Sequence, residues 1–273
     1  MYFAGVDAGS TTTKAVVLDA KGELVAKSLL PTGANVIRAA ERSYEEVLEG
    51  AGIGENDIGY VIGTGYGRYK VDFGDDQVTE ISCHAKGAHL LFPKTRTLVD
   101  IGGQDTKAIR LSEEGEVLDF CMNDKCAAGT GRFLENAASI LDLSLDEIGP
   151  VSLRADAAIR LSNVCTVFVE SEIIAHLARG RTIEDILGGV HQAVAARTIA
   201  LVRRIGIEEE VTFTGGVSRN VGMVETLTAR FGTEINVSEL AQYMGCLGAA
   251  LFALERGQGA EDLRARRVTV EEA

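Results

Sequence analysis

An internal repeat constrains the fold of this chain more than any other feature. Val6–Leu24 and Val99–Val117 align without a gap at an offset of 93 positions, and nine of the nineteen aligned residues are identical. Each copy reads as an apolar strand ending in Asp, a turn of small residues, a second apolar strand, a further turn and a third strand. We expect the third strands at 23–30 and 116–122. The repeat therefore predicts two similar units that each begin with a three-stranded β-meander.

Alternating helical and strand patterns follow each copy of the repeat. Strand patterns that run into glycine turns occur at 60–67 and 211–216, and a short strand pattern occurs at 233–237. Three strands followed by helices and strands, twice over, predict an α/β fold of two lobes with a cleft between them. We expect the prolines to lie between elements, because proline lacks an N–H donor and has a fixed φ; they are Pro31, Pro93 and Pro150. The helical patterns cover residues 35–52, 83–92, 131–142, 167–180, 183–206, 221–232 and 245–257.

The turn between the first two strands of each copy has the composition of a phosphate site. Closely spaced backbone N–H groups can bind phosphate only where the side chains are small enough to admit the anion. Aspartates beside these turns suit Mg²⁺, which takes carboxylates, waters and phosphate oxygens. One such turn alone is more simply a hairpin signal, but two matching turns favour a metal–nucleotide site. The candidate residues are Gly9, Ser10, Thr11, Thr12 and the charged Lys14 in the first copy, Gly102 and Gly103 in the second copy, and the acids Asp7, Asp100 and Asp105.

Composition and motifs argue against several classes of function. The net charge of −13 disfavours a nucleic-acid partner, because such partners select for a basic surface. The N-terminal residues 1–10 do not resemble a signal peptide, and no apolar run approaches the ~18 residues of a membrane span. We therefore expect a cytoplasmic protein. The sequence G-x-x-x-x-G-K-[ST] does not occur and neither turn leads into a predicted helix, so the phosphate site is not a P-loop.

The cysteines are candidate ligands rather than disulfide partners, because an odd number at irregular spacing disfavours a disulfide framework. Cys126 and Cys165 each precede a predicted helix, where free N–H groups and the helix dipole stabilise a thiolate. A cubane iron–sulfur cluster needs four thiolates, and two cysteines from each of two chains related by a twofold axis would supply them. Buried, unreactive thiols are the alternative from the residues alone. We expect packing roles for Cys83 and Cys121.

Three segments resemble the phosphate and adenosine segments of the acetate and sugar kinase, Hsp70 and actin superfamily. They are "DAGSTTTK" (7–14), "DIGGQD" (100–105) and "FTGGVSRN" (213–220). The resemblance implies two duplicated actin-like, or ribonuclease H-like, lobes around an ATP cleft. The first lobe would comprise 1–95 together with the C-terminal helix 244–257, and the second lobe would comprise 96–243.

The resemblance also implies roles within the ATP site. Mg²⁺ would be bound by Asp7 and Asp105, directly or through water. Gln104, Asp105 and Asp7 are the candidates to orient the attacking water, and the sequence does not rank them. The residues implied around the adenosine and elsewhere on the nucleotide are Gly131, Gly215, Gly216, Val217 and Gln242.

Further motifs resemble one branch of this superfamily, the ATP-dependent activators, or archerases, of 2-hydroxyacyl-CoA dehydratases and the related ATPase subunits of benzoyl-CoA reductases. One difference is Cys246, where this branch usually has alanine. The motifs occur in the same order along nearly the whole chain and include "GTGYGR" (63–68), "EISCHAKGA" (80–88), "NDKCAAGTGRFLE" (123–135) and "CTVFVESE" (165–172).

The resemblance to this branch implies an ATP-driven one-electron reductase. One 4Fe-4S cluster would bridge a homodimer through Cys126 and Cys165, and MgATP hydrolysis would drive a low-potential electron from it to a partner dehydratase or reductase. Ferredoxin or flavodoxin is the implied type of electron donor. A cluster-free sugar-type kinase of the same fold and a nucleotide-gated scaffold are the alternatives, although no sugar motif and no peptide-binding domain stand out. The sequence does not identify the partner.

Overall fold

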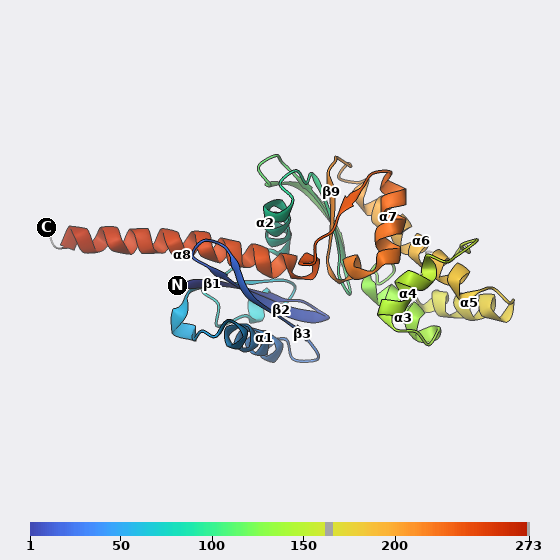
Figure 1. Ribbon diagram of the computed structural model, residues 1–273, viewed down its shortest axis with the longest axis horizontal. Helices are drawn as coiled ribbons and strands as arrows, with labels where there is room; N and C mark the ends of the chain where they lie inside the picture. Colours follow the sequence, from blue (N-terminus) through green and yellow to red (C-terminus); the bar gives the residue numbers. More distant parts are fainter. Residues whose placement is uncertain (162–165, 272–273) are drawn as a thin grey trace. The chain divides into compact units, whose positions relative to one another are not determined.

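The computed structural model describes residues 1–161 and 166–271, and the chain divides into two compact units. The first unit comprises Met1–Leu90 and the segment that begins at Tyr243, and the second comprises Leu91–Gln242. In each unit the described strands form a five-stranded mixed sheet with helices packed on it (Figure 1).

The first unit is built on a sheet with the strand order β3-β2-β1-β4-β5. The first three strands in the sequence form an antiparallel meander, and β4 and β5 extend the sheet from β1 in parallel. The strands are β1 (Tyr2–Ala8), β2 (Thr12–Asp19), β3 (Leu24–Pro31), β4 (Ile58–Thr64) and β5 (Asp76–Gln77). The helices are α1 (Val36–Ala51), α2 (Glu80–Leu91) and α8 (Met244–Glu271).

The second unit repeats this arrangement with the strand order β8-β7-β6-β9-β10. Its first three strands again form an antiparallel meander, and β9 and β10 again extend the sheet in parallel. The prediction of a duplicated α/β fold is therefore confirmed. The strands are β6 (Thr97–Ile101), β7 (Thr106–Leu111), β8 (Val117–Asn123), β9 (Val211–Thr214) and β10 (Ile235–Asn236), and the helices are α3 (Gly131–Ile140), α4 (Leu145–Ser152), α5 (Thr166–Ala178), α6 (Ile183–Val202) and α7 (Val221–Phe231).

Helix limits in both units coincide with residues that satisfy free backbone groups. The side chains of Asn35 and Thr182 accept hydrogen bonds from the first turns of α1 and α6. Gly52 ends α1 with a φ of 67°, a left-handed conformation that glycine adopts without steric cost.

The central strand β1 of the first unit is buried on both faces. Ala4 and Val6 pack with residues of α1, while Phe3 packs with residues of α2 and α8. This division follows from the alternation of side chains along a strand. Gly5 lies directly against α8, and a Cβ at this position would overlap the backbone carbonyl of Cys246. The glycine therefore allows α8 to approach the strand that carries the first turn.

The core of the second unit lies between one face of its sheet and helices α3 to α7. Val99, Ile101 and Phe213 from the strands pack there with Phe133 of α3 and Val190 of α6. This core supports both the second turn, which follows β6, and the glycine segment that follows β9.

The short helix α4 contradicts the expectation that every proline lies between elements. Pro150 is inside α4, and Pro31 is the last residue of β3. The Ser144 hydroxyl and backbone N–H both donate to the carboxylate of Glu147 at the start of α4. This S-x-x-E capping signal was present in the sequence. Pro150 is tolerated because α4 is short and ends two residues later, which limits the number of helical hydrogen bonds that the missing N–H disrupts.

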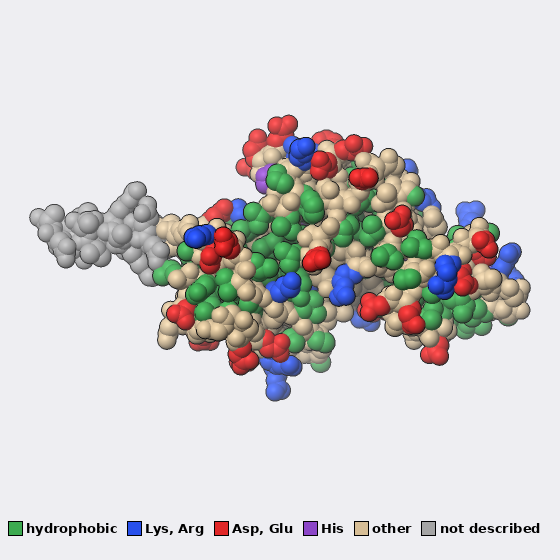
Figure 2. Space-filling model, in the orientation of Figure 1, with side chains coloured by type: hydrophobic (Ala, Val, Ile, Leu, Met, Phe, Trp, Pro, Cys, Tyr) green, Lys and Arg blue, Asp and Glu red, His purple; other side chains and the backbone are tan. Residues whose placement is uncertain are grey.

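Within the described residues, no helix is both long and apolar enough to span a bilayer. On the face seen in Figure 2, acidic and basic side chains are scattered among uncharged ones rather than gathered into a basic stripe.

Two glycines of α8 provide a matched test of the packing in the first unit. A Cβ on Gly248 would overlap the carbonyl of Cys83 in α2, whereas a Cβ on Gly259 would have no neighbour within 4 Å. We expect Gly248→Ala to lower the free energy of unfolding by about 1–3 kcal/mol through overpacking. Gly259→Ala should raise it by up to about 1 kcal/mol, since alanine favours helix. Urea denaturation measures both changes, and an equal effect of the two substitutions would contradict the close α2–α8 contact.

Candidate functional site

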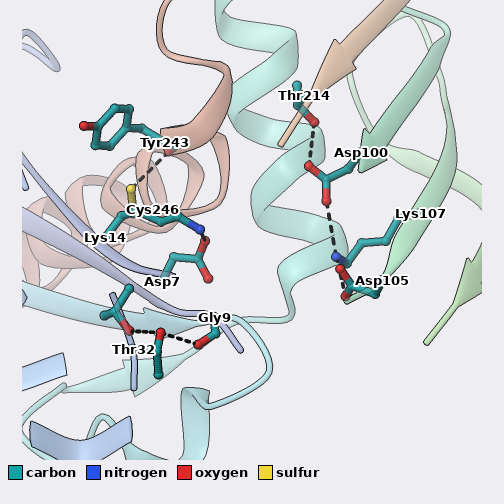
Figure 3. A network of polar contacts seen from close by, with 11 residues as sticks. Asp7, Gly9, Lys14, Thr32, Asp100, Asp105, Lys107, Thr214, Tyr243 and Cys246 are labelled. Atoms are coloured by element: carbon teal, nitrogen blue, oxygen red, sulfur yellow. Dashed lines mark hydrogen bonds and ion pairs between the residues drawn. The ribbon is translucent and has the colours of Figure 1, made fainter. Parts of the chain in front are cut away.

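The first turn, Gly9–Thr12, is held in place by its neighbours in the first unit. The backbone N–H of Gly9 donates to the carbonyl of Asp7 at 3.1 Å, and a Cβ on Gly9 would lie only 2.6 Å from the carbonyl of Thr12. Thr32, just after β3, donates its hydroxyl to the carbonyl of Gly9 at 2.8 Å (Figure 3). Its backbone N–H donates to the carbonyl of Thr11 at 3.0 Å. The shape of the turn is therefore fixed by the protein itself.

The side chains of this turn leave a hydrogen-bonding group unused. The hydroxyl of Thr11 is buried and has no partner among the described residues. A buried hydroxyl without a partner costs free energy, so it indicates a position where a ligand is expected to bind. Ser10 and Thr12 are half-buried beside it. The turn thus combines a glycine that admits close approach with an unsatisfied hydroxyl.

Asp7 and Lys14 lie opposite each other on β1 and β2. The Lys14 ammonium is 3.5 Å from the Asp7 carboxylate, and the Lys14 side chain keeps 15 % of its surface exposed (Figure 3). This long ion pair leaves the ammonium able to contact a further anion.

The repeat places Asp100 and Lys107 at the same register in the second unit, but in a different environment. Lys107 is only 3 % exposed and lies 3.2 Å from Asp100 and 2.7 Å from Asp105 (Figure 3). Thr214 of β9 donates its hydroxyl to the other carboxylate oxygen of Asp100 at 2.9 Å. Sequence reasoning did not select Lys107 or Thr214, although the alignment of Lys107 with Lys14 was a usable signal.

The second turn is a tight four-residue connection between β6 and β7. The N–H of Gly102 donates to the carbonyl of Asp105 at 3.0 Å, and a Cβ on Gly102 would lie 2.6 Å from an Asp105 carboxylate oxygen. Gln104 at the tip is exposed, and its side chain has no hydrogen-bond partner among the described residues. Of the three residues considered for orienting water, only Gln104 has a side chain that is not already paired with a lysine.

The glycine motif at 63–68 lies beside the start of the first turn, a position that the sequence did not assign to it. Gly65 has a φ of 88°, and a Cβ there would overlap a carboxylate oxygen of Asp7. The N–H of Gly67 donates to the carbonyl of Ala8 at 2.8 Å. This segment therefore supports the end of β1 and fixes the position of the Asp7 carboxylate.

The beginning of α3 is attached directly to the second turn. The N–H groups of Gly131 and Arg132 donate to the carbonyls of Gly102 and Gly103 at 2.9 and 2.8 Å. These N–H groups belong to the first turn of the helix, where no helical carbonyl is available to them. A Cβ on Gly131 would lie 3.0 Å from the carbonyl of Gly102 and 3.2 Å from Val217. Glycine at 131 thus allows the turn, the helix and the segment after β9 to meet.

The segment after β9 contains the other residues expected around the nucleotide. Gly215 has a φ of 86°, and a Cβ there would overlap the carbonyl of Ile101. Its N–H donates to the carbonyl of Ala241 at 3.0 Å, and a Cβ on Gly216 would lie 3.4 Å from the side-chain amide of Gln242. The structure therefore brings Gly215, Gly216, Val217 and Gln242 together beside the second turn.

Asn220, the last residue of this motif, has a structural role. Its side-chain oxygen accepts the N–H of Met223 at 3.0 Å and so caps α7. The same oxygen lies 3.0 Å from Nε2 of His191, whose Nδ1 lies 2.8 Å from the carbonyl of Leu187. Burial lowers the pKa of His191, although both hydrogen bonds oppose the shift.

Cys126 lies in the segment 124–130 between β8 and α3, here called the Cys126 segment, and hydrogen bonds hold this segment in place. The Asn123 side chain donates to the carbonyl of Cys126 at 2.9 Å, and the Thr106 hydroxyl donates to the carbonyl of Gly129 at 2.7 Å. The thiol itself is half-buried. The second expected cluster ligand, Cys165, lies outside the described residues, and α5 begins at Thr166.

The other described cysteines are less suited to ligand chemistry. Cys83 and Cys246 are fully buried. Burial raises the pKa of Cys83 to about 12 and raises that of Cys246 well above its ordinary value. Cys121 lies on β8 and packs against the core of the second unit. No group of three or more His, Cys, Asp or Glu side chains arranged to hold a metal ion occurs among the described residues.

Comparison with known proteins identifies similar chains over almost the whole length. A model of the BadF/BadG/BcrA/BcrD ATPase family matches residues 4–253. The activator of lactoyl-CoA dehydratase from Anaerotignum propionicum is 44% identical over 258 residues, which cover 94% of this chain and 99% of the relative. A solved structure of the activator of the 2-hydroxyisocaproyl-CoA dehydratase from Clostridium difficile, with bound ADPNP, has a TM-score of 0.91 at 42% identity and covers 96% of this chain and 97% of that chain.

More distant structures share only the fold. A ROK family glucokinase from Streptomyces griseus, in complex with glucose and AMPPNP, has a TM-score of 0.59 at 14% identity and covers 93% of this chain and 100% of that chain.

Two glycines with positive φ provide a matched test of whether Gly65 determines the position of the Asp7 carboxylate. Gly65→Ala should weaken Mg²⁺-dependent nucleotide binding by about tenfold or more, because the new methyl group displaces the Asp7 carboxylate. Gly52→Ala also places alanine at a positive φ, with a φ of 67° and no neighbour within 4 Å. It should cost about 1–2 kcal/mol of stability and leave nucleotide affinity unchanged. Equal affinities of the two variants, measured by titration calorimetry, would contradict this role of Gly65.

The two lysines of the repeat should respond differently to replacement by methionine. Lys107→Met removes the buried cation shared by the buried Asp100 and the partly exposed Asp105, so we expect a loss of about 3–5 kcal/mol of stability. Lys14→Met breaks a long, partly exposed ion pair and should cost about 1 kcal/mol or less. It should instead weaken ATP binding by about tenfold or more. Chemical denaturation and nucleotide titration separate the two effects, and a reversal of the pattern would contradict the assignment.

Proposed function

This chain belongs to the BadF/BadG/BcrA/BcrD ATPase family, and from this membership we propose that it is an ATP-dependent activator of a 2-hydroxyacyl-CoA dehydratase or a related reductase. The similar chains support the class of partner, since two of them are named activators of dehydratases that differ in substrate.

The residues of the first turn suit the phosphates of ATP. The Thr11 hydroxyl supplies a donor that the protein does not use, and Gly9 keeps its surroundings free of side chain. Lys14 supplies a partly exposed positive charge, as phosphate binding requires. We assign Mg²⁺ to Asp7 and Asp105, directly or through water, because Mg²⁺ prefers few carboxylates together with waters and phosphate oxygens.

We assign the orientation of the attacking water to Gln104. Its side chain is exposed at the tip of the second turn and free of described partners, so its amide can contact both water and phosphate. Asp105 is paired with Lys107 at 2.7 Å and Asp7 with Lys14 at 3.5 Å, which leaves them better suited to metal binding than to water activation.

The cluster assignment rests on the chemistry of the cysteines. Cys126 is the described cysteine that combines partial exposure with a position on a loop, whereas burial and a raised pKa disfavour Cys83 and Cys246 as thiolates. We propose that Cys126 and Cys165 from two copies of the chain hold one 4Fe-4S cluster in a homodimer. Such a cluster supplies a one-electron carrier whose potential depends on hydrogen bonding and exposure.

The observation that carries the proposal is the attachment of α3 to the second turn. Gly131 and Arg132 hydrogen-bond to Gly102 and Gly103, and the segment of Cys126 leads directly into this helix. If ATP and ADP make different contacts with the turn, they favour different positions of the turn. Movement of the turn then moves the beginning of α3 and the segment that carries Cys126. Ferredoxin or flavodoxin is the proposed type of electron donor.

The cluster assignment is tested by replacing one cysteine at a time in protein purified without oxygen. Cys126→Ala should reduce the iron content to near zero and leave ATP affinity within about twofold of the unmodified chain, because the turns do not involve this thiol. Cys121→Ala, on the adjacent strand, is the matched control and should keep its iron. Full iron content in Cys126→Ala would refute the ligand assignment.

The activity is tested with the same preparations. The unmodified protein should hydrolyse ATP and, with a reduced donor, activate a 2-hydroxyacyl-CoA dehydratase. The variant Cys126→Ala should bind and hydrolyse ATP but should not activate the dehydratase. Phosphorylation of a sugar by iron-free protein would instead support a kinase of the same fold.

A further inference from the structure

A hollow of about 230 Å³ lies in the second unit on the side of the Cys126 segment that faces α6. One wall is formed by Thr106, Asn123 and Gly129, and the other by α6 and the turn that follows it. The hollow is smaller than the ~300–1,000 Å³ typical of sites for larger organic ligands. We propose that it binds a small doubly charged oxyanion such as inorganic phosphate.

Two arginines give the hollow its charge. Arg197 and Arg204 both line it, with Leu201 between them. Neither guanidinium forms an ion pair or hydrogen bond with any residue in the part of the chain that the structure describes. The Arg204 side chain is exposed to solvent, so its charge is available to a ligand that enters the hollow. Two cationic side chains that line one hollow without a described partner favour an anion as its ligand.

The Arg197 side chain is positioned by direct packing on the Cys126 segment. Gly129 has a φ of 95°, and a Cβ there would lie 3.1 Å and 3.2 Å from Cβ and Cδ of Arg197. Glycine at this position therefore lets the stem of the arginine lie against the loop. Arg197 itself is half-buried, so its orientation is restricted more than that of an ordinary surface arginine.

The neutral groups of the hollow do not compete with the arginines as donors. The hydroxyls of Thr106 and Thr198 donate to the carbonyls of Gly129 and Val194, at 2.7 and 3.1 Å. The guanidinium groups thus supply the strong free donors, and their planar forks suit the bidentate binding of phosphate.

An anion in the hollow would also restrain the Cys126 segment. Asn123 and Thr106, which line the hollow, hold the carbonyls of Cys126 and Gly129. An anion between this wall and α6 would link the segment to the helix. The importance of this restraint for a cluster held by Cys126 rests on the proposed function, whereas the anion site itself does not.

Thermal unfolding of the full chain tests the anion site. Inorganic phosphate at about ten times its dissociation constant should raise the melting temperature by about 3 °C relative to sodium chloride of equal ionic strength. The double variant Arg197→Gln/Arg204→Gln should lose this shift. Arg203→Gln is the matched control, because Arg203 adjoins Arg204 in sequence, carries the same charge and does not line the hollow; it should keep the shift.

Several outcomes would overturn the proposal. They are the absence of a phosphate shift in the unmodified protein, its retention in the double variant and its loss in Arg203→Gln. Loss of the shift in Lys14→Met would show that phosphate acts at the first turn instead. An equal shift with acetate would refute a preference for doubly charged oxyanions.

The reactivity of Cys126 provides a second measurement in cluster-free protein. Phosphate should slow alkylation of Cys126 by iodoacetamide severalfold, as read by mass spectrometry of the peptide, and leave Cys121 unchanged. The double variant should show no such protection. Protection of Cys126 that persists in the double variant would contradict the link between the hollow and the segment.

Discussion

The organisation of the second unit depends on a close approach of backbone at Gly131. The first two N–H groups of α3 bind the carbonyls of the second turn, and a single Cβ at residue 131 would press on that turn and on Val217. Three segments far apart in the sequence can therefore meet only because this position has no side chain. The same contact makes the turn and the helix one mechanical element, so a ligand that shifts the turn also acts on the residues before α3.

The duplication has preserved the backbone and changed the electrostatics. Both sheets have the same strand order, and each places a lysine opposite an aspartate that is the second-to-last residue of its first strand. In the first unit the lysine is partly exposed at the end of a long ion pair, whereas in the second it is buried between two aspartates. A buried cation held by two carboxylates is fully engaged. The first copy therefore retains a charge for the ligand, and the second uses its lysine to hold the acids in place.

The sequence predicted the structure correctly where interactions between residues close in the sequence determine it. The repeat of Val6–Leu24 at Val99–Val117 predicted both meanders, because alternation and turn chemistry act within a few residues. Thr32 and Gly65 were not recognised, since their contacts with the first turn arise from long-range packing that spacing does not encode. Helix α4 was not predicted, because Pro150 was expected to lie between elements. The surroundings of Cys165 lie outside the described residues, so the sequence remains the basis of that assignment.

The Cys126 segment is connected both to the second turn and to the hollow, so ligands at these two places can affect each other's affinity. On one side Gly131 and Arg132 connect it to the second turn, and on the other Asn123 and Thr106 connect it to the hollow that Arg197 lines. If a ligand at either place shifts the segment between two positions, each ligand must alter the affinity of the other by the same factor. A nucleotide that favours a particular position of the segment would then change the affinity of the hollow for its anion, and the anion would change nucleotide affinity equally. Asn123 binds the carbonyl of Cys126 on the side of the hollow, and Gly131 binds the carbonyl of Gly102 on the side of the turn, so substitutions at these two residues should alter such coupling most.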